Sequence, residues 1–293
     1  MSLTLDHVVI AVHDLDAAVA DYTALGFNVL RGGDHPGRAT HNALVVFADG
    51  SYFELIAWKS PSPEERWWQL LQRQGEGIVD FALLPPDTAQ TVAGAARHGL
   101  VLDGPIDGGR VRPDGERLRW QTARPSSHDL PFLCGDLSPR ALRVPEGDAR
   151  VHPNGATGVA SLAIAVHDIE ATAARYRALL GSDADAADPV GPALALPGAV
   201  ERFGLVRLGH TFLVLVSPRE RADGPSAPSA PIAQRLSLRG EGPCALVLRS
   251  TTLGTNARPR RLDLGLTHGA SIEFDSTPLL DTPSRTASSA LES

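Results

Sequence analysis

LDHVVIAVHDLDAAVADYTALG, from Leu5 to Gly26, decides the fold, because the chain nearly repeats it 154 residues later as VASLAIAVHDIEATAARYRALLG, from Val159 to Gly181. Each copy opens with an apolar, β-branched strand, passes an aspartate suited to a helix N-cap, and continues into an alanine-rich amphipathic helix that a glycine ends. A period of about half the chain indicates a duplicated architecture rather than a short-repeat solenoid.

The two copies differ at one position of chemical interest. His7 of the first copy becomes Ser161 in the second, so chemistry at His7 belongs to the first half only. His13 and His167 recur identically just before the expected N-caps. Because they recur in the half that lacks His7, we expect both to be architectural.

Further strands complete each repeat. In the first copy, three strand patterns follow the helix, and a tight turn over residues 48–51 joins the last two into a hairpin. This order predicts a βαβββ unit. The run from Gly77 matches this unit at an offset of 73 residues, so Asp80 falls on His7. A fourth unit begins at Pro243, with a poorly supported helix over 251–261. The sequence predicts an α+β protein of four βαβββ units, the fourth eroded.

The expected organisation has two halves. Residues 3–139 hold the first two units and the expected cleft, and 159–275 hold the two degenerate ones. A segment rich in Pro, Gly and charge, 140–158, reads as a linker between them. The stretch 219–231 is a low-complexity loop that we expect to be mobile, and the tail 276–293 is expected to lack fixed structure.

Composition excludes several function classes. A net charge of −7 argues against a nucleic-acid partner, and no apolar run approaches the ~20 residues of a membrane span or indicates a secretory signal. Because two cysteines cannot form a disulfide framework, we expect the protein to reside in the reducing cytoplasm. Lys59 is the sole lysine and lies in a Pro/Ser-rich turn, which disfavours Schiff-base chemistry. Without a phosphate-binding loop or a GxGxxG motif, we expect no nucleotide and no flavin.

Three ionisable side chains lie centrally in apolar strand patterns. They are His7, Glu54 and Asp80. A buried carboxylate or imidazole needs a partner, such as an arginine, a hydrogen-bond donor or a metal ion.

Together with the paired units, these residues resemble the vicinal oxygen chelate superfamily, which includes glyoxalase I, extradiol dioxygenases, fosfomycin-resistance enzymes and bleomycin-binding proteins. The resemblance covers roughly residues 5–275. Closer motifs resemble the glyoxalase-like domain proteins: GDHPG (33–37), THNAL (40–44), YFELI (52–56), PFL (131–133) and HPNGA (152–156). The resemblance implies two paired, curved mixed sheets with helices packed outside.

In metal-dependent members, the first and fourth strands of two paired units supply the ligands of a divalent ion. The resemblance carries this role to His7, Glu54 and Asp80, with Zn²⁺, Mn²⁺, Fe²⁺ or Ni²⁺ as the candidate metal. The fourth position falls near 133–135, where Gly135 stands in place of a glutamate. The alternative is that His7 bonds across the sheet while the carboxylates pair with arginines such as Arg38, Arg119 or Arg124.

The glycine-rich segment 32–42 supplies further candidates. His41 would act as a general base beside Glu54, and Arg38 and Asn42 would bind substrate. Trp120 and His152 are further candidates for substrate binding and would cover the same cleft.

Two functions therefore remain open, beside a third possibility, a scaffold whose site has decayed. One is metal-dependent lyase or isomerase chemistry through an enolate or oxyanion, in a cleft that binds a small oxygenated molecule. The other is a non-catalytic, metal-free binding protein of the bleomycin-resistance type. The extradiol dioxygenase version is rejected, because the second-half positions near Ser161, Cys244 and Glu273 keep only the glutamate. Monomer and homodimer both remain open.

Overall fold

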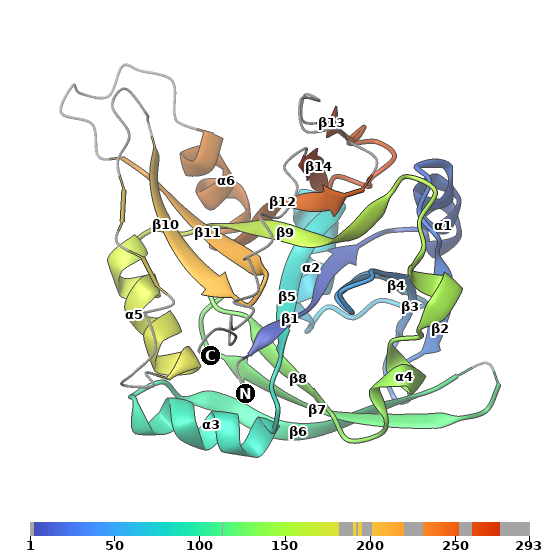
Figure 1. The fold of residues 1–293 in the computed structure, drawn as a ribbon, viewed down its shortest axis with the longest axis horizontal. Helices are drawn as coiled ribbons and strands as arrows, with labels where there is room; N and C mark the ends of the chain where they lie inside the picture. Colours follow the sequence, from blue (N-terminus) through green and yellow to red (C-terminus); the bar gives the residue numbers. More distant parts are fainter. Residues whose placement is uncertain are drawn as a thin grey trace, which may run out of the picture.

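The computed structural model describes residues 3–112, 114–181, 190–191, 193–194, 201–219, 231–251 and 260–275. Its strands form two mixed sheets, one from each half of the chain (Figure 1). The tail 276–293 and most of the 219–231 loop lie outside the described residues, as does most of the segment where the fourth helix was in question.

The first sheet has eight strands in the order β2-β3-β4-β1-β5-β8-β7-β6. The central strands β1 and β5 run antiparallel, and each pairs in parallel with the last strand of its own unit. This arrangement confirms two paired βαβββ units. The strands are β1 (Thr4–Ala11), β2 (Leu30–Asp34), β3 (Thr40–Val46), β4 (Tyr52–Trp58), β5 (Gly77–Leu84), β6 (Leu102–Val111), β7 (Arg117–Pro125) and β8 (Phe132–Asp136).

The helices of this half include one that the sequence analysis did not anticipate. It is α2 (Arg66–Gln74), which lies between the two units. The expected helices are α1 (Leu15–Ala24) and α3 (Thr88–Arg97), each with an aspartate side chain capping its first turn. The segment expected to be a linker folds into α4 (Arg140–Arg143) and the 3-10 helix η1 (Gly147–Arg150).

The second sheet has six strands in the order β10-β11-β9-β12-β14-β13. It repeats the central antiparallel pair and the parallel pairing within each unit. Its elements are β9 (Ala156–Ala165), α5 (Ile169–Leu180), β10 (Glu201–Leu208), β11 (Thr211–Pro218), α6 (Pro231–Arg239), β12 (Gly242–Ser250), β13 (Arg260–Arg261) and β14 (Ser271–Asp275).

One apolar core joins the halves. Strand residues that face away from the first cleft, such as Val8 and Ile10, belong to the same buried cluster as Ile164 and Phe274 of the second half. The repeated tyrosines cross between the halves. The Tyr22 hydroxyl donates to the carbonyl of Thr267 (3.1 Å), and the Tyr176 hydroxyl donates to that of Asp129 (3.0 Å).

The repeated histidines occupy equivalent positions in the two halves. The backbone N–H of His13 donates to the Glu76 carboxylate (2.7 Å), and that of His167 donates to Glu241 (2.8 Å). Both histidine side chains are exposed. The two copies therefore share the backbone hydrogen bond at the turn into α1 and α5, which does not depend on the histidine side chain.

Curvature of the first sheet creates the cleft. Its two edge strands, β2 and β6, approach each other, so the sheet closes most of the way into a barrel (Figure 1). The Gly33 backbone lies so close to β6 that a Cβ there would sit 3.1 Å from the Val111 carbonyl. Leu71 of α2 packs over one end of the concave face, and Val144, just after α4, packs over the other.

None of the helices in the described part of the chain is both long and apolar enough to cross a membrane.

Candidate functional site

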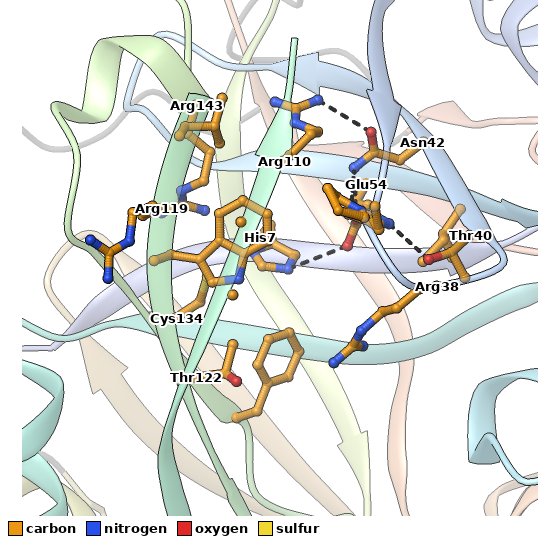
Figure 2. A pocket seen from close by; sticks show the side chains of 18 of the residues that line it. His7, Arg38, Thr40, Asn42, Glu54, Arg110, Arg119, Thr122, Cys134 and Arg143 are labelled. Carbon is orange, nitrogen blue, oxygen red and sulfur yellow. Dashed lines mark hydrogen bonds and ion pairs between the residues drawn. The ribbon is translucent and has the colours of Figure 1, made fainter. Parts of the chain in front are cut away.

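A cleft of about 440 Å³ occupies the concave face of the first sheet. Figure 2 shows its charged and aromatic side chains converging from opposite sides of the curved sheet. Lining residues used below are His7, His35, Arg38, Thr40, Asn42, Tyr52, Glu54, Trp67, Arg110, Trp120, Phe132, Cys134 and Arg143.

A β-bulge positions His7. Leu5 and His7 pair with consecutive residues of β5, so the intervening Asp6 has no partner of its own on that strand. A bulge re-aims a side chain, and Asp6 thereby joins His7, with Asp6 Oδ2 2.7 Å from His7 Nδ1. The His7 ring stacks on Tyr52 at 4.7 Å between centroids. These contacts leave Nε2 directed at Glu54, 3.6 Å from its Oε2 (Figure 2).

Glu54 lies at the centre of the cleft, because alternation along β4 gives Tyr52, Glu54 and Ile56 one face. Its Oε1 accepts a hydrogen bond from Asn42 Nδ2 (2.7 Å) and lies 3.6 Å from His35 Nε2. Burial raises the pKa of this carboxyl, but His7, His35 and the Asn42 hydrogen bond outweigh that effect and hold the pKa below its usual range. Glu54 is therefore an ionised, almost fully buried carboxylate at neutral pH.

His35, rather than His41, is the second histidine of the cleft. Its Nδ1 lies 2.8 Å from the Thr40 hydroxyl. Burial lowers the pKa of His35 below its ordinary value, so the ring is neutral at pH 7. The Trp120 ring meets it edge-on at 6.3 Å.

His41 and His152 do not line the cleft. Along β3, Thr40, Asn42 and Leu44 face inward, and alternation turns His41 to the opposite face. The buried His152 ring accepts from the backbone N–H of Asn28 (2.9 Å) and lies 2.9 Å from the Val46 carbonyl. Both ring nitrogens are thus used in holding the segment after η1, and the geometry supports neither a base role for His41 nor a substrate role for His152.

Arg143 and Asp6 form a buried charge network behind His7. The Arg143 guanidinium donates to Asp6 (2.7 Å), to Asp136 (2.6 Å) and to the Tyr52 hydroxyl (2.7 Å). Arg140 adds a 2.8 Å bond to Asp6. Although burial opposes ionisation, these cations and His7 hold the pKa of Asp6 far below its usual range. The network fixes His7 through its Nδ1.

Asp80 lies in an adjoining cavity rather than in this cleft. It accepts from Trp67 Nε1 (2.9 Å) and Arg124 (3.4 Å), and Arg66 lies 3.8 Å away. The expected alternative therefore holds for Asp80, which pairs with Arg124, but not for Glu54, which has no arginine ion pair among the described residues.

Strand register places the fourth chelate position at Phe132 instead of 133–135. Val9 pairs with Glu54 on β4, and Ala82, its counterpart 73 residues later, pairs with Phe132 on β8. An aromatic ring thus replaces a carboxylate. Gly135 faces away, because a Cβ there would collide with Thr88.

The donor set does not fit the chelate site that the resemblance implies. Of its four positions, Asp80 is held by Trp67 and arginines, and the register puts Phe132 at the fourth. Within the described ranges, no group of three or more His, Cys, Asp or Glu side chains is arranged to hold a metal ion.

The described strands of the second sheet do not supply an alternative set of metal ligands. Register gives Ser161 and Val214 as the counterparts of His7 and Glu54. Glu273 accepts from Arg261 (2.8 Å). The cleft of the first sheet also lacks a reactive thiol, because burial raises the pKa of Cys134 to about 12.

Three important residues were missed by the sequence analysis. His35 stands within the quoted GDHPG motif, and Asp6 stands beside His7, so local signals existed for both. Arg110 had none, because it reaches the site only through closure of the barrel and donates to Asn42 Oδ1 across 3.3 Å.

Comparison with known proteins agrees with this fold. The family model of the glyoxalase-like domain matches residues 5–180. A hypothetical protein from Staphylococcus aureus superposes with a TM-score of 0.66 at 12% identity, covering 93% of this chain and 99% of its own. A mutant of 4-hydroxymandelate synthase from Streptomyces coelicolor superposes with a TM-score of 0.55 at 18% identity, covering 85% of this chain and 71% of its own. No curated protein sequence matches.

Proposed function

Because the chain belongs to the glyoxalase-like domain family of the vicinal oxygen chelate superfamily, while its cleft departs from the chelate pattern, we propose that it binds a small oxygenated molecule directly, without a resident metal. The proposal follows the metal-free alternative that the sequence left open. It concerns the cleft of the first half, and one fold in this superfamily hosts many functions.

The observation that carries the proposal is the state of Glu54. Its carboxylate is ionised, buried and aimed into a 440 Å³ cleft, and among the described residues its Oε2 accepts no hydrogen bond and has one charged neighbour, His7 Nε2, at 3.6 Å. A hydroxyl or enol group of a ligand would donate to this oxygen and complete its hydrogen bonding. A lowered pKa makes Glu54 a weak base, which favours binding over proton abstraction by this residue.

The test measures ligand binding in the presence of a chelator. Hydroxy acids, diols and phenols are screened by ligand-observed NMR in EDTA-containing buffer, against the wild type, Glu54→Gln and His41→Ala. We expect Glu54→Gln to weaken the hits about tenfold or more, since hydrogen bonds to charged groups contribute roughly 1.5–3 kcal/mol. His41→Ala, on the same strand pair but outside the cleft, should leave them unchanged.

Two results would overturn the proposal. One is binding that requires an added divalent metal. The other is equal affinity of the wild type and Glu54→Gln for every hit.

A second candidate function rests on His35. A neutral imidazole that lines the cleft beside Glu54 suits a proton acceptor, which would isomerise a bound compound. Under this candidate, His35→Gln abolishes turnover of a bound compound but retains its binding. The wild-type rate stays constant at neutral pH and declines only below the ordinary histidine pKa of about 6.5, as His35 becomes protonated. Absence of any product from all bound compounds leaves binding as the function.

A further inference from the structure

Arg110 is a buried cation that lies near Glu54 but forms no ion pair with a carboxylate of the described residues. Only 5% of its surface is exposed, and it lines the cleft from β6. Its hydrogen bond is a 3.3 Å contact to Asn42 Oδ1, and no carboxylate of the described residues forms an ion pair with it. Burying an unpaired charge is costly, so an arginine in this environment ordinarily acquires an anion.

Arg143 also lines this cleft and is as deeply buried, but its guanidinium is fully paired. It is 4% exposed and is held by the carboxylates of Asp6 and Asp136 and by the Tyr52 hydroxyl. The fold therefore neutralises one buried arginine completely and leaves the other facing the cavity.

The backbone makes room for the Arg110 side chain. Gly32 lies where a Cβ would collide with both the Arg110 guanidinium and the Asn42 amide. The Arg110–Asn42 contact joins β6 to β3 across the closing edges of the barrel, and Figure 2 shows the guanidinium end directed at Asn42 above Glu54. Burial lowers the pKa of Arg110, and Arg143 and Arg112 add to this effect, whereas the nearby Tyr52 and Glu54 oppose it.

We propose that Arg110 is an anion-binding residue, and that the ligand of this cleft is a singly charged carboxylate whose carboxylate group pairs with its guanidinium. This inference rests on the proposed function and names the ligand class. A planar guanidinium matches the two oxygens of a carboxylate.

The charges in the cleft and the side chains that line its walls restrict the ligand class further. Asn42 bridges the two charges, donating to Glu54 and accepting from Arg110. Because the ionised Glu54 repels a second negative charge, a monoanion fits better than a phosphate dianion. Tyr52, Trp120 and Phe132 supply apolar and aromatic walls for the body of the ligand.

The test compares matched acid and amide pairs. Benzoate with benzamide, salicylate with salicylamide, and lactate with lactamide are titrated by NMR and calorimetry into the wild type, Arg110→Gln, Arg110→Lys and Arg119→Gln, with inorganic phosphate as a separate probe. Arg119 also lines the cleft, but its side chain is 65% exposed and pairs with Asp107, so it provides the matched control.

We expect the wild type to bind at least one acid about tenfold or more tightly than its amide, and Arg110→Gln to lose that preference while amide affinity changes less than about twofold. Arg119→Gln should keep the preference. Arg110→Lys should keep part of it, since it retains charge without the fork geometry. Because Arg110→Gln removes an unpaired buried charge, its melting temperature without ligand should equal or exceed that of the wild type.

Four outcomes would overturn the inference, and they separate it from the proposed function. An acid preference that survives in Arg110→Gln, or equal binding of acids and amides by the wild type, removes the role of Arg110 but leaves a binding cleft. If phosphate binds more tightly than every acid tested, and its binding depends on Arg110, then the ligand class is a phosphate and not a carboxylate. Binding of neither acids nor amides removes both the inference and its premise for these probe classes.

Discussion

Two adjacent residues of one strand, Asp6 and His7, decide the character of the site. Asp6 is fully buried, and its charge is balanced by Arg143 and Arg140. As a result, Asp6 holds the His7 ring at Nδ1, and the Nε2 atom of the ring points toward the Glu54 carboxylate. The second repeat keeps the irregular register of β9 but carries Ala160 and Ser161 there, so the same backbone has no such chemistry.

The buried carboxylate of Asp6 predicts an acid-sensitive stability. Its pKa is lower in the folded protein than the ordinary value of about 3.9 in the unfolded chain, so the stability it contributes is fully present above that value. That stability is lost as the pH falls below about 4 toward the folded-state pKa. In Asp6→Asn, we expect a shallower decline of the free energy of unfolding between about pH 5 and pH 2, measured by urea denaturation at several pH values.

The same substitution should also cost about 3 kcal/mol or more at pH 7, because it leaves Arg143 without one of its buried partners. Asp16→Asn, at an exposed carboxylate, is the control and should change little. Parallel stability curves for the wild type and Asp6→Asn would contradict this assignment.

At the scale of elements, the duplicated helices α1 and α5 explain why the two copies share a tyrosine. Tyr22 and Tyr176 are fully buried, and each donates to a backbone carbonyl of the opposite half. The repeat motif therefore encodes the contact between the halves as well as the individual unit.

Removing either tyrosine hydroxyl tests this role. Tyr22→Phe and Tyr176→Phe should each lower the free energy of unfolding by about 1 kcal/mol, because each removes a buried hydrogen bond between the halves. Guanidinium denaturation measures the effect, and ligand binding in the distant cleft should be unaffected. Val101→Ala, at a residue that is 78% exposed, is a control for general perturbation. A stability equal to the wild type in both tyrosine variants would show that these hydrogen bonds contribute nothing.

At the scale of the whole molecule, one core spans both sheets, so the halves should unfold together. The chain offers a direct measurement, because all four tryptophans (Trp58, Trp67, Trp68 and Trp120) lie in the first half. Tryptophan fluorescence therefore reports that half alone, while far-UV circular dichroism reports both. We expect coincident denaturation midpoints, and a separate fluorescence transition would show that the halves are independent.

Much of the fold was predictable from local patterns, whereas the site was predictable only in part. Alternation along β1 and β4 correctly marked His7 and Glu54 as inward-facing, and Asn42, Arg38 and Trp120 also line the cleft. The same alternation, applied to β3, would have turned His41 outward. Helix α2 was missed, although the second half holds a counterpart, α6, in the same place before β12.

The sequence by itself determined the duplication, the strand–helix order and the replacement of His7 by Ser161 in the second copy, because periodicity and residue identity are local properties of the chain. Only the tertiary structure decided that Asp6 turns inward at a bulge, that Phe132 rather than 133–135 aligns with Glu54, and that Arg110 meets Asn42. These features depend on register and on closure of a curved sheet, which bring together residues far apart in the sequence, such as Asn42 and Arg110 at 68 positions, through backbone geometry that no local pattern records.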